Sequence, residues 1–100
     1  MHVITLKTLK NAANVHGSIA AQLDVWYRIA KSAKWRSIED VRPAYPNADG
    51  VPVGSKVYTV FNIHGNSFRL IVGINYESAT IFVKRVLTHA EYNKGDWKKK

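Results

Sequence analysis

The sequence predicts an α+β fold in which N-terminal helices pack on one face of an antiparallel sheet. Apolar side chains in residues 19–34 recur every three to four positions, which is the period of an amphipathic helix. Residues 56–87 are instead rich in Val, Ile, Phe, Tyr and Thr and are interrupted by short turns. Because helical patterns come first and closely spaced strands follow, we expect the two to form separate layers of a single domain, residues 1–100.

The first half contains three predicted helices after a short strand. His2–Thr5 is a β-branched run that suits an edge strand, and Leu6–Val15 suits a short helix. Ile19–Lys34 is predicted as the main helix, with Ser18 as its N-cap. A short helix at residues 37–40, capped by Ser37, ends before two prolines. One apolar stripe of the main helix is expected to enter the core: Ile19, Leu23, Trp26, Tyr27 and Ala30.

The second half is predicted as a meander that follows a loop. Tyr45–Gly54 carries turn residues and is expected to be this loop. The predicted strands are Lys56–Ile63, Phe68–Tyr76 and Ala79–Leu87, joined by turns at Gly65-Asn66 and Glu77-Ser78. Such short connections require antiparallel neighbours.

The Gly65-Asn66 turn sets which side chains share a face of the sheet. With Gly65 first in a type II′ turn, Asn62 stands opposite Arg69, and His64 stands opposite Ser67. A loop at His64-Gly65 keeps the same parity, whereas a three-residue loop reverses it. The face away from the helices is then expected to collect mainly polar side chains: Asn62, His64, Ser67, Arg69 and Asn75, with Ile71 among them.

Charge and composition narrow the function classes. The formal net charge is +8, and residues 51–100 carry 8 Lys+Arg against 3 Asp+Glu. This excess suits a polyanionic partner such as nucleic acid, although many small basic proteins carry charge only for solubility. Cysteine is absent, so thiolate metal sites and nucleophiles are excluded. No apolar run reaches the roughly 18 residues of a membrane span, and we expect a cytoplasmic protein.

The stretch Thr88-His89-Ala90-Glu91-Tyr92 allows two interpretations. Thr88 and Glu91 fit a capping box, which would explain much of the motif as the start of a helix. The alternative places His89 and Tyr92 on the same face as Arg69, joined by Lys84 or Arg85 but not both, because strand neighbours point oppositely.

Arginine, lysine, histidine and tyrosine together suit the cleavage of a phosphodiester. The cations stabilise charge on the phosphate, and His or Tyr moves a proton. In RNA the 2′-OH is a built-in nucleophile, so this chemistry requires no metal and no cofactor. The histidines show no spacing typical of a metal site. The opposing interpretation is that Arg69 is an ordinary solvated residue on an exposed sheet face.

Nearly the whole chain resembles the HigB family of type II toxin–antitoxin toxins, within the RelE-like group. The resemblance is carried by MHVI, WYRIAKSAKW, IEDVRPAYPNAD, VFNIHGNSFRL and VKRVLTHAEYNKGDWK. It implies a small α+β ribonuclease that cleaves mRNA on the translating ribosome without a metal. It also implies neutralisation by a HigA-type helix-turn-helix antitoxin, with DNA bound only through that complex. The family motif maps onto Asn62, Gly65, Asn66, Arg69, Lys84, Thr88, His89, Glu91 and Tyr92.

The resemblance favours Lys84 over Arg85, because relatives carry a basic residue there. Arg69 and Lys84 are then expected to bind the phosphate, with His89 as first choice for general acid or base and Tyr92 sharing its work. The residues expected to contact RNA are Asn62, His64, Asn66, Lys94 and the tail Lys98–Lys100. Two other functions fit the same charge: a non-catalytic RNA- or partner-binding module, and an interaction protein that docks an acidic partner. A neighbouring helix-turn-helix gene would favour the toxin.

Overall fold

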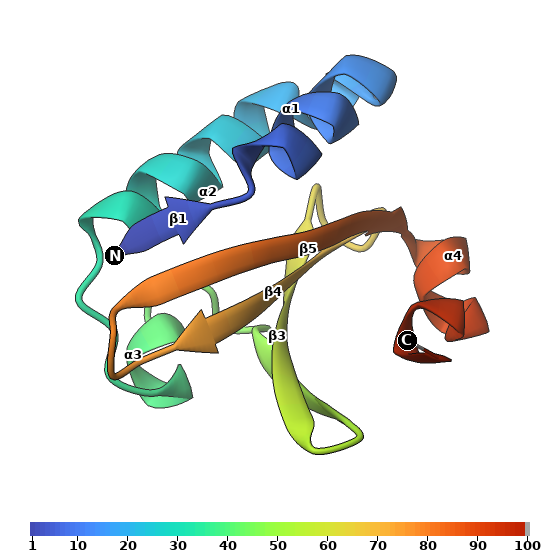
Figure 1. Ribbon diagram of the computed structural model, residues 1–100. Coiled ribbons are helices and arrows are strands. Elements are labelled where there is room, and N and C mark those ends of the chain that lie inside the picture. Colours follow the sequence, from blue (N-terminus) through green and yellow to red (C-terminus); the bar gives the residue numbers. More distant parts are fainter. Residues whose placement is uncertain (100) are drawn as a thin grey trace.

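A five-stranded sheet forms the centre of the structure, a computed structural model that describes residues 1–99. The strand order is β1-β5-β4-β3-β2, and β1 (His2–Ile4) runs parallel to β5 at one edge. The other strands form an antiparallel meander: β2 (Asp49–Val53), β3 (Lys56–Ile63), β4 (Phe68–Asn75) and β5 (Thr80–Thr88). The predicted α+β class and the predicted edge strand near the N-terminus are confirmed (Figure 1).

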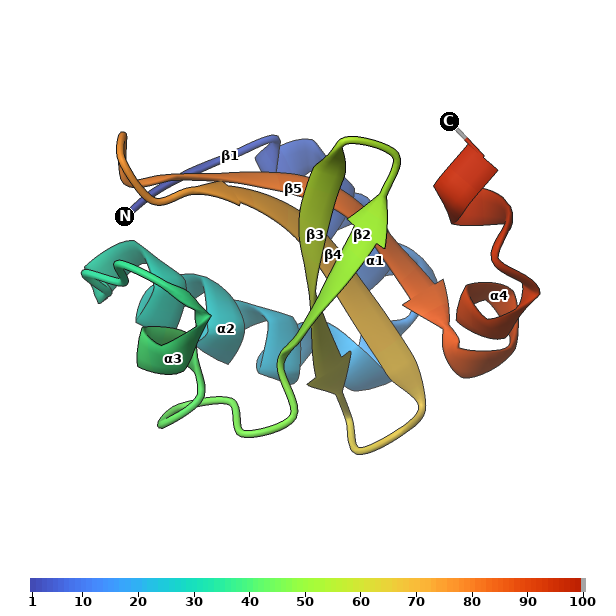
Figure 2. The same ribbon diagram turned by 90° about the horizontal axis from the view of Figure 1, so that it is seen from below.

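The helices occur in two groups along the chain. The first group is α1 (Leu6–Val15), the 3₁₀ turn η1 (Gly17–Ile19), α2 (Ala20–Ser32) and α3 (Ile38–Val41). The second is α4 (His89–Lys94) and the 3₁₀ turn η2 (Asp96–Lys99). Figure 2 shows the twisted sheet with α2 and α3 on one side and with α4 at the far end. No helix within residues 1–99 combines the length and the apolar character needed to cross a bilayer.

Two details of the first half differ from prediction. Ser18 was expected to cap the main helix, but it lies inside η1, and α2 begins only at Ala20. Residues 49–53 were expected to be loop but form β2. Gly50 and Pro52 resemble turn residues in sequence, yet β2 is an edge strand, where a proline without a backbone N–H is tolerated.

The main core lies between the first helices and one face of the sheet. Trp26 of α2 and Phe61 of β3 are fully buried and meet edge to face, with ring centroids 5.5 Å apart. Tyr45 and Trp35 pack around the same phenylalanine at 5.2 and 6.3 Å. The predicted stripe is confirmed, because Ile19, Leu23, Trp26 and Ala30 are buried and Tyr27 packs against them.

The β3–β4 hairpin has the predicted register. Asn62 pairs with Arg69, and the Ser67 N–H donates to the His64 carbonyl at 3.2 Å, so Gly65 and Asn66 are the central turn residues. Gly65 has φ +65°, as the first position of a type II′ turn requires.

His64 departs from the predicted face, because its own φ is +55° and the side chain no longer follows the strand alternation. Its Nδ1 lies 3.5 Å from the Gln22 amide nitrogen of α2. His64 is therefore turned toward the helices rather than toward Arg69.

A β-bulge in β5 overturns the expectation that only one of Lys84 and Arg85 faces away from the helices. Ile71 pairs with Arg85 but the next residue, Val72, pairs with Val83, so Lys84 is the extra residue. Val83 is buried, whereas Lys84 and Arg85 are both exposed. Strict alternation, on which the prediction relied, fails at this position.

Helix α4 begins and ends with specific backbone chemistry. The Glu91 N–H donates to Thr88 Oγ1 at 3.2 Å, and the Thr88 N–H donates to Glu91 Oε1 at 2.9 Å. The predicted capping box is confirmed. Gly95 ends the helix in the left-handed region at φ +75°, and its N–H donates to the Tyr92 carbonyl at 3.1 Å. This turn redirects the chain, so that η2 lies back against α4.

Candidate active site

Arg69 is held at the turn of the β3–β4 hairpin. Its Nη1 donates to the carbonyls of Asn66 and Phe68, both at 3.2 Å, and its Nη2 lies 3.5 Å from Asn66 Oδ1. These contacts lie within a few residues of Arg69, so the hairpin alone orients the side chain. They use one edge of the guanidinium, which leaves other N–H groups of its five donors for an anion.

His89 reaches the same turn from the first residue of α4. Its backbone N–H donates to the Ser67 carbonyl at 2.9 Å, which joins the helix start to the hairpin. Its ring Nδ1 lies 3.0 Å from the Asn66 carbonyl oxygen. Because a carbonyl only accepts, this contact requires the proton on Nδ1. In the neutral ring the lone pair is then on Nε2, and the side chain is exposed, so Nε2 is available to accept a proton.

Tyr92 lies one helical turn after His89, beside the arginine. The Arg69 Cζ atom is 5.6 Å from the centre of the Tyr92 ring. Burial raises the pKa of Tyr92 above its ordinary value of 10.0, the Asp49 carboxylate raises it further, and the Arg69 guanidinium partly offsets both. The phenol therefore carries its proton at neutral pH and loses it only above pH 10.

Three rings extend this cluster along the sheet and form what we call the aromatic row: Tyr92, Trp97 and Tyr58. Trp97 of η2 stacks on Tyr92 at 5.4 Å and 19°, and its Nε1–H donates to the Tyr92 carbonyl at 3.3 Å. Trp97 also meets Tyr58 of β3 edge to face at 6.3 Å. Lys84 lies over the Tyr58 ring at 5.9 Å, so the row ends in a cation at both ends.

A second small buried group lies beneath this part of the molecule. Val60 and Ile71 pair with each other in the sheet and are only 3% and 1% exposed, but they are not part of the core under the helices. They alternate along their strands with the residues of the main core, so they point to the opposite face. This face is therefore not an open polar surface, because α4 and η2 cover part of it.

The structure brings together only some of the predicted site residues. Arg69, Asn66, His89 and Tyr92 meet at the hairpin turn and the start of α4. Lys84 stands apart from them at the other end of the aromatic row. The roles of these residues stay predictions.

The predicted RNA-contacting residues are more scattered. Asn62 is opposite Arg69 in the register, but it also lines a cavity of about 280 Å³ with His64 beside α2. Lys94 lines a different cavity of about 280 Å³ with Arg85 and Trp97.

Only part of the lysine tail is placed. Lys98 is exposed, and its Nζ lies 5.7 Å from the centre of the Trp97 ring. Lys100 lies outside the described residues. The tail was expected to contact RNA, and its first two residues, Lys98 and Lys99, belong to η2.

Sequence reasoning missed Trp97, Tyr58 and Asp49. One signal for Trp97 was present, because Gly95 after a helix predicts a left-handed cap that turns the chain back. Tyr58 shares the strand parity of Asn62, so its face was available from the register. Asp49 had no such signal, because it belongs to the strand that was taken for a loop.

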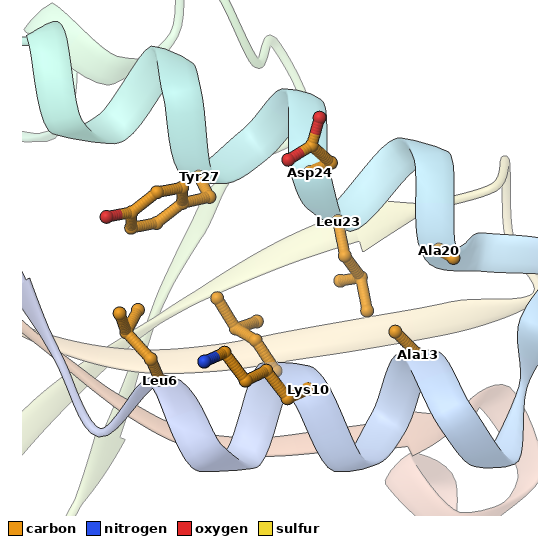
Figure 3. A pocket seen from close by; sticks show the side chains of 8 residues that line it. Leu6, Lys10, Ala13, Ala20, Leu23, Asp24 and Tyr27 are labelled. Carbon is orange, nitrogen blue, oxygen red and sulfur yellow. The ribbon is translucent and has the colours of Figure 1, made fainter.

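Another cavity lies away from this cluster, in the groove between α1 and α2. Its volume is about 380 Å³, and Figure 3 shows apolar side chains of both helices facing each other across it, among them Leu6, Ala13 and Leu23. Lys10 and Asp24 are its only charged lining residues among those described. Within residues 1–99, three or more His, Asp or Glu side chains nowhere come close enough to hold a metal ion.

Comparison with known proteins decides the family. A family model described as HigB toxin, the RelE-like toxic component of a toxin–antitoxin system, matches residues 19–95. The chain belongs to the HigB family. This match includes the hairpin, the bulge and α4, but it ends before Trp97.

Curated HigB relatives match over most of their length. An mRNA interferase HigB from Escherichia coli O6:H1 is 34% identical over 94 residues, which cover 94% of this chain and 90% of that protein. An mRNA interferase toxin HigB from E. coli K12 is 30% identical over 93 residues, which cover 93% of this chain and 88% of that protein. An mRNA interferase HigB from Shigella flexneri matches to the same extent.

Proposed function

We propose that this HigB-family toxin is an endoribonuclease that cleaves mRNA by attack of a 2′-OH on the adjacent phosphate. The observation that carries the proposal is the cluster at the hairpin turn, where Arg69, His89 and Tyr92 meet. The relatives' name, mRNA interferase, supports the same substrate.

Each group in the cluster has a distinct part in this reaction. His89 Nε2 accepts the 2′-OH proton, and the 2′ oxygen bonds to phosphorus as the bond to the 5′ oxygen breaks. Tyr92 donates its proton to that leaving oxygen, and the products are a 2′,3′-cyclic phosphate and a 5′-OH end. Arg69 stabilises the charge that develops on the phosphate oxygens.

The surroundings of the cluster supply binding rather than chemistry. Lys84 and Lys98 lie along the aromatic row and attract the RNA backbone, while Asn62 and Asn66 orient the chain or hold Arg69. The net charge of +8 favours association with the polyanionic ribosome. We therefore propose that the toxin acts in the cytoplasm and cleaves mRNA that is bound to the ribosome.

A toxin of this family has an antitoxin partner, and we propose a HigA-type helix-turn-helix protein, through which alone the toxin contacts DNA. The resemblance of the whole chain supports this partner. A neighbouring gene for such a protein would agree with it.

The proposal is tested by induced expression in growing cells, with 5′ ends of mRNA mapped in each culture. We expect growth arrest with new internal mRNA ends for the wild type, and loss of both in Arg69→Ala and His89→Ala. Matched controls are Arg28→Ala, whose side chain is 77% exposed in an ion pair on α2, and His2→Ala on the exposed edge of β1. Cleavage that persists in both site variants would rule out the mechanism. Arrest without any new mRNA ends would favour a non-catalytic RNA-binding module.

A further inference from the structure

A cavity on the face of the sheet away from α1 and α2 is not used by the proposed reaction. It has a volume of about 450 Å³ and lies over β3, β4 and β5. Phe82 of β5 lines it and is 39% exposed, and Val57 of β3, which also lines it, is 63% exposed, so the cavity has an apolar wall open to solvent. Gly73 is paired opposite Phe82 and also lines the cavity.

The shape of the cavity depends on the missing side chain at Gly73. A Cβ built at this position would lie 3.8 Å from the Tyr58 ring, which is ordinary contact distance, so no steric conflict requires glycine. Its φ is not positive either, so the backbone does not require glycine. Glycine instead leaves space between Phe82 and Tyr58, and a flat ligand that stacks on an aromatic ring fits such a space.

The charge around the cavity favours an anionic ligand. Lys56 and Lys84 line it, and none of the described residues that line it is acidic. A ligand with a flat ring beside negative charge is a nucleotide, and an exposed ring flanked by lysines is a common arrangement for binding single-stranded nucleic acid.

The cavity adjoins the end of the aromatic row that is away from Arg69. Tyr58 is the last ring of the aromatic row, and it also lines the cavity together with Lys84. An RNA strand whose scissile phosphate lies at Arg69 can therefore pass Trp97 and reach the cavity along one side of the molecule.

We propose that this cavity is a nucleobase subsite, which holds an unpaired base of the same RNA stacked on Phe82 while Lys56 and Lys84 bind the neighbouring phosphates. This inference rests on the proposed function, because it assigns the occupant to the RNA that is cleaved. It adds a site for binding that is separate from the groups that transfer protons.

The test uses the full chain and short single-stranded RNA with 2′-O-methyl groups, which binds but has no 2′-OH to attack. Binding is followed by amide shifts, in particular that of Gly73, and is compared with a fully abasic oligomer of the same length and charge. For the wild type we expect about 10-fold tighter binding to the RNA with bases. Phe82→Ala should lower that affinity about 10-fold and leave the abasic affinity unchanged, whereas Phe82→Trp should retain it.

Ile29→Ala is the matched control, because Ile29 is 37% exposed on α2, almost as much as Phe82, and lies far from the cavity. Lys84→Ala should weaken binding of both oligomers, since it removes a contact to phosphate.

Several outcomes would overturn the subsite: equal affinity for both oligomers, unchanged binding in Phe82→Ala, or no response at Gly73. A response at Gly73 to the antitoxin but not to RNA would assign the surface to a protein contact instead. Since the methylated RNA is not cleaved, these outcomes are separate from the nuclease. Normal mRNA cleavage with unchanged binding in Phe82→Ala removes only the subsite, whereas base-dependent binding without cleavage removes only the nuclease.

Discussion

Substituting Gly95 tests whether the turn after α4 holds the aromatic row in place. Gly95 has φ +75°, and a Cβ there would meet no atom within 4 Å. The cost of Gly95→Ala is therefore conformational and amounts to about 1–2 kcal/mol for a left-handed alanine.

That cost is similar to the interactions that hold η2 on α4. Stacking of Trp97 on Tyr92 contributes about 0.5–1.5 kcal/mol, and the bond from Trp97 Nε1 to the Tyr92 carbonyl contributes about the same. A strain of 1–2 kcal/mol changes the ratio of docked to undocked η2 by about 5–30-fold. The main core does not include Trp97, so the midpoint of global thermal unfolding should stay nearly unchanged.

Hydrogen exchange of the Trp97 indole N–H measures this docking directly. We expect its protection to fall in Gly95→Ala by the factor above, and the pKa of Tyr92 to fall toward 10.0 as the ring becomes more hydrated. Gly54→Ala is the matched control, because Gly54 also has a positive φ of +61° with open space around it, but in the β2–β3 turn. Equal indole protection in Gly95→Ala and the wild type would refute the reasoning, as would an equal loss in Gly54→Ala.

Three other predictions concern the start of α4 and the residues around it. His89→Asn keeps a side-chain donor near the turn but has no proton acceptor at the Nε2 position. The rate of mRNA cleavage should therefore fall about 10²–10⁴-fold, with little change in thermal stability. If the variant cleaves mRNA as fast as the wild type, His89 is not the base. Thr88→Ala removes the hydroxyl that accepts the Glu91 N–H and should cost about 1 kcal/mol in urea unfolding, whereas an unchanged midpoint would show that the cap is dispensable. Asp49→Asn removes a charge that raises the pKa of Tyr92, so an NMR titration should give a lower value, and an equal or higher one would contradict the assigned cause. Because the folded-state pKa of Tyr92 is above 10.0, its contribution to stability is complete below pH 10 and is lost as the pH rises from 10 through the folded value.

The proximity of the main site residues was predictable because two local rules agree. Turn chemistry fixes the hairpin register, and the capping box places the start of α4 directly after β5. Thr88 pairs with Phe68, so the first residue of α4 must lie beside the hairpin turn. Both rules act over a few residues, which is why one of the two interpretations drawn from the sequence could place His89 beside Arg69.

The wrong predictions concern residues whose conformation depends on tertiary contacts rather than on the local sequence. The bulge at Lys84 adds a residue to β5, and no glycine or proline in the sequence indicates it. Side chains therefore do not alternate between the two sheet faces at this position, as the prediction had assumed. A left-handed backbone is uncommon for any residue other than glycine, and the His64 ring contacts Gln22, which is distant in sequence. The contacts of Trp97 likewise depend on how η2 packs against the rest of the protein.

The position of β5 in the sheet determines when the protein can fold during its own synthesis. This strand lies between β1 and β4, yet it is the last of the strands within residues 1–99 to be made. His2 can pair with Thr80 only after Thr80 itself has been joined to the chain. Until then β1 has no neighbour, and the apolar stripes of α1 and α2 have no complete sheet to cover. A nascent chain that stops before β5 therefore has neither a closed core nor the strand that leads into α4, and the cluster of Arg69, His89 and Tyr92 can assemble only after β5 and α4 have been made.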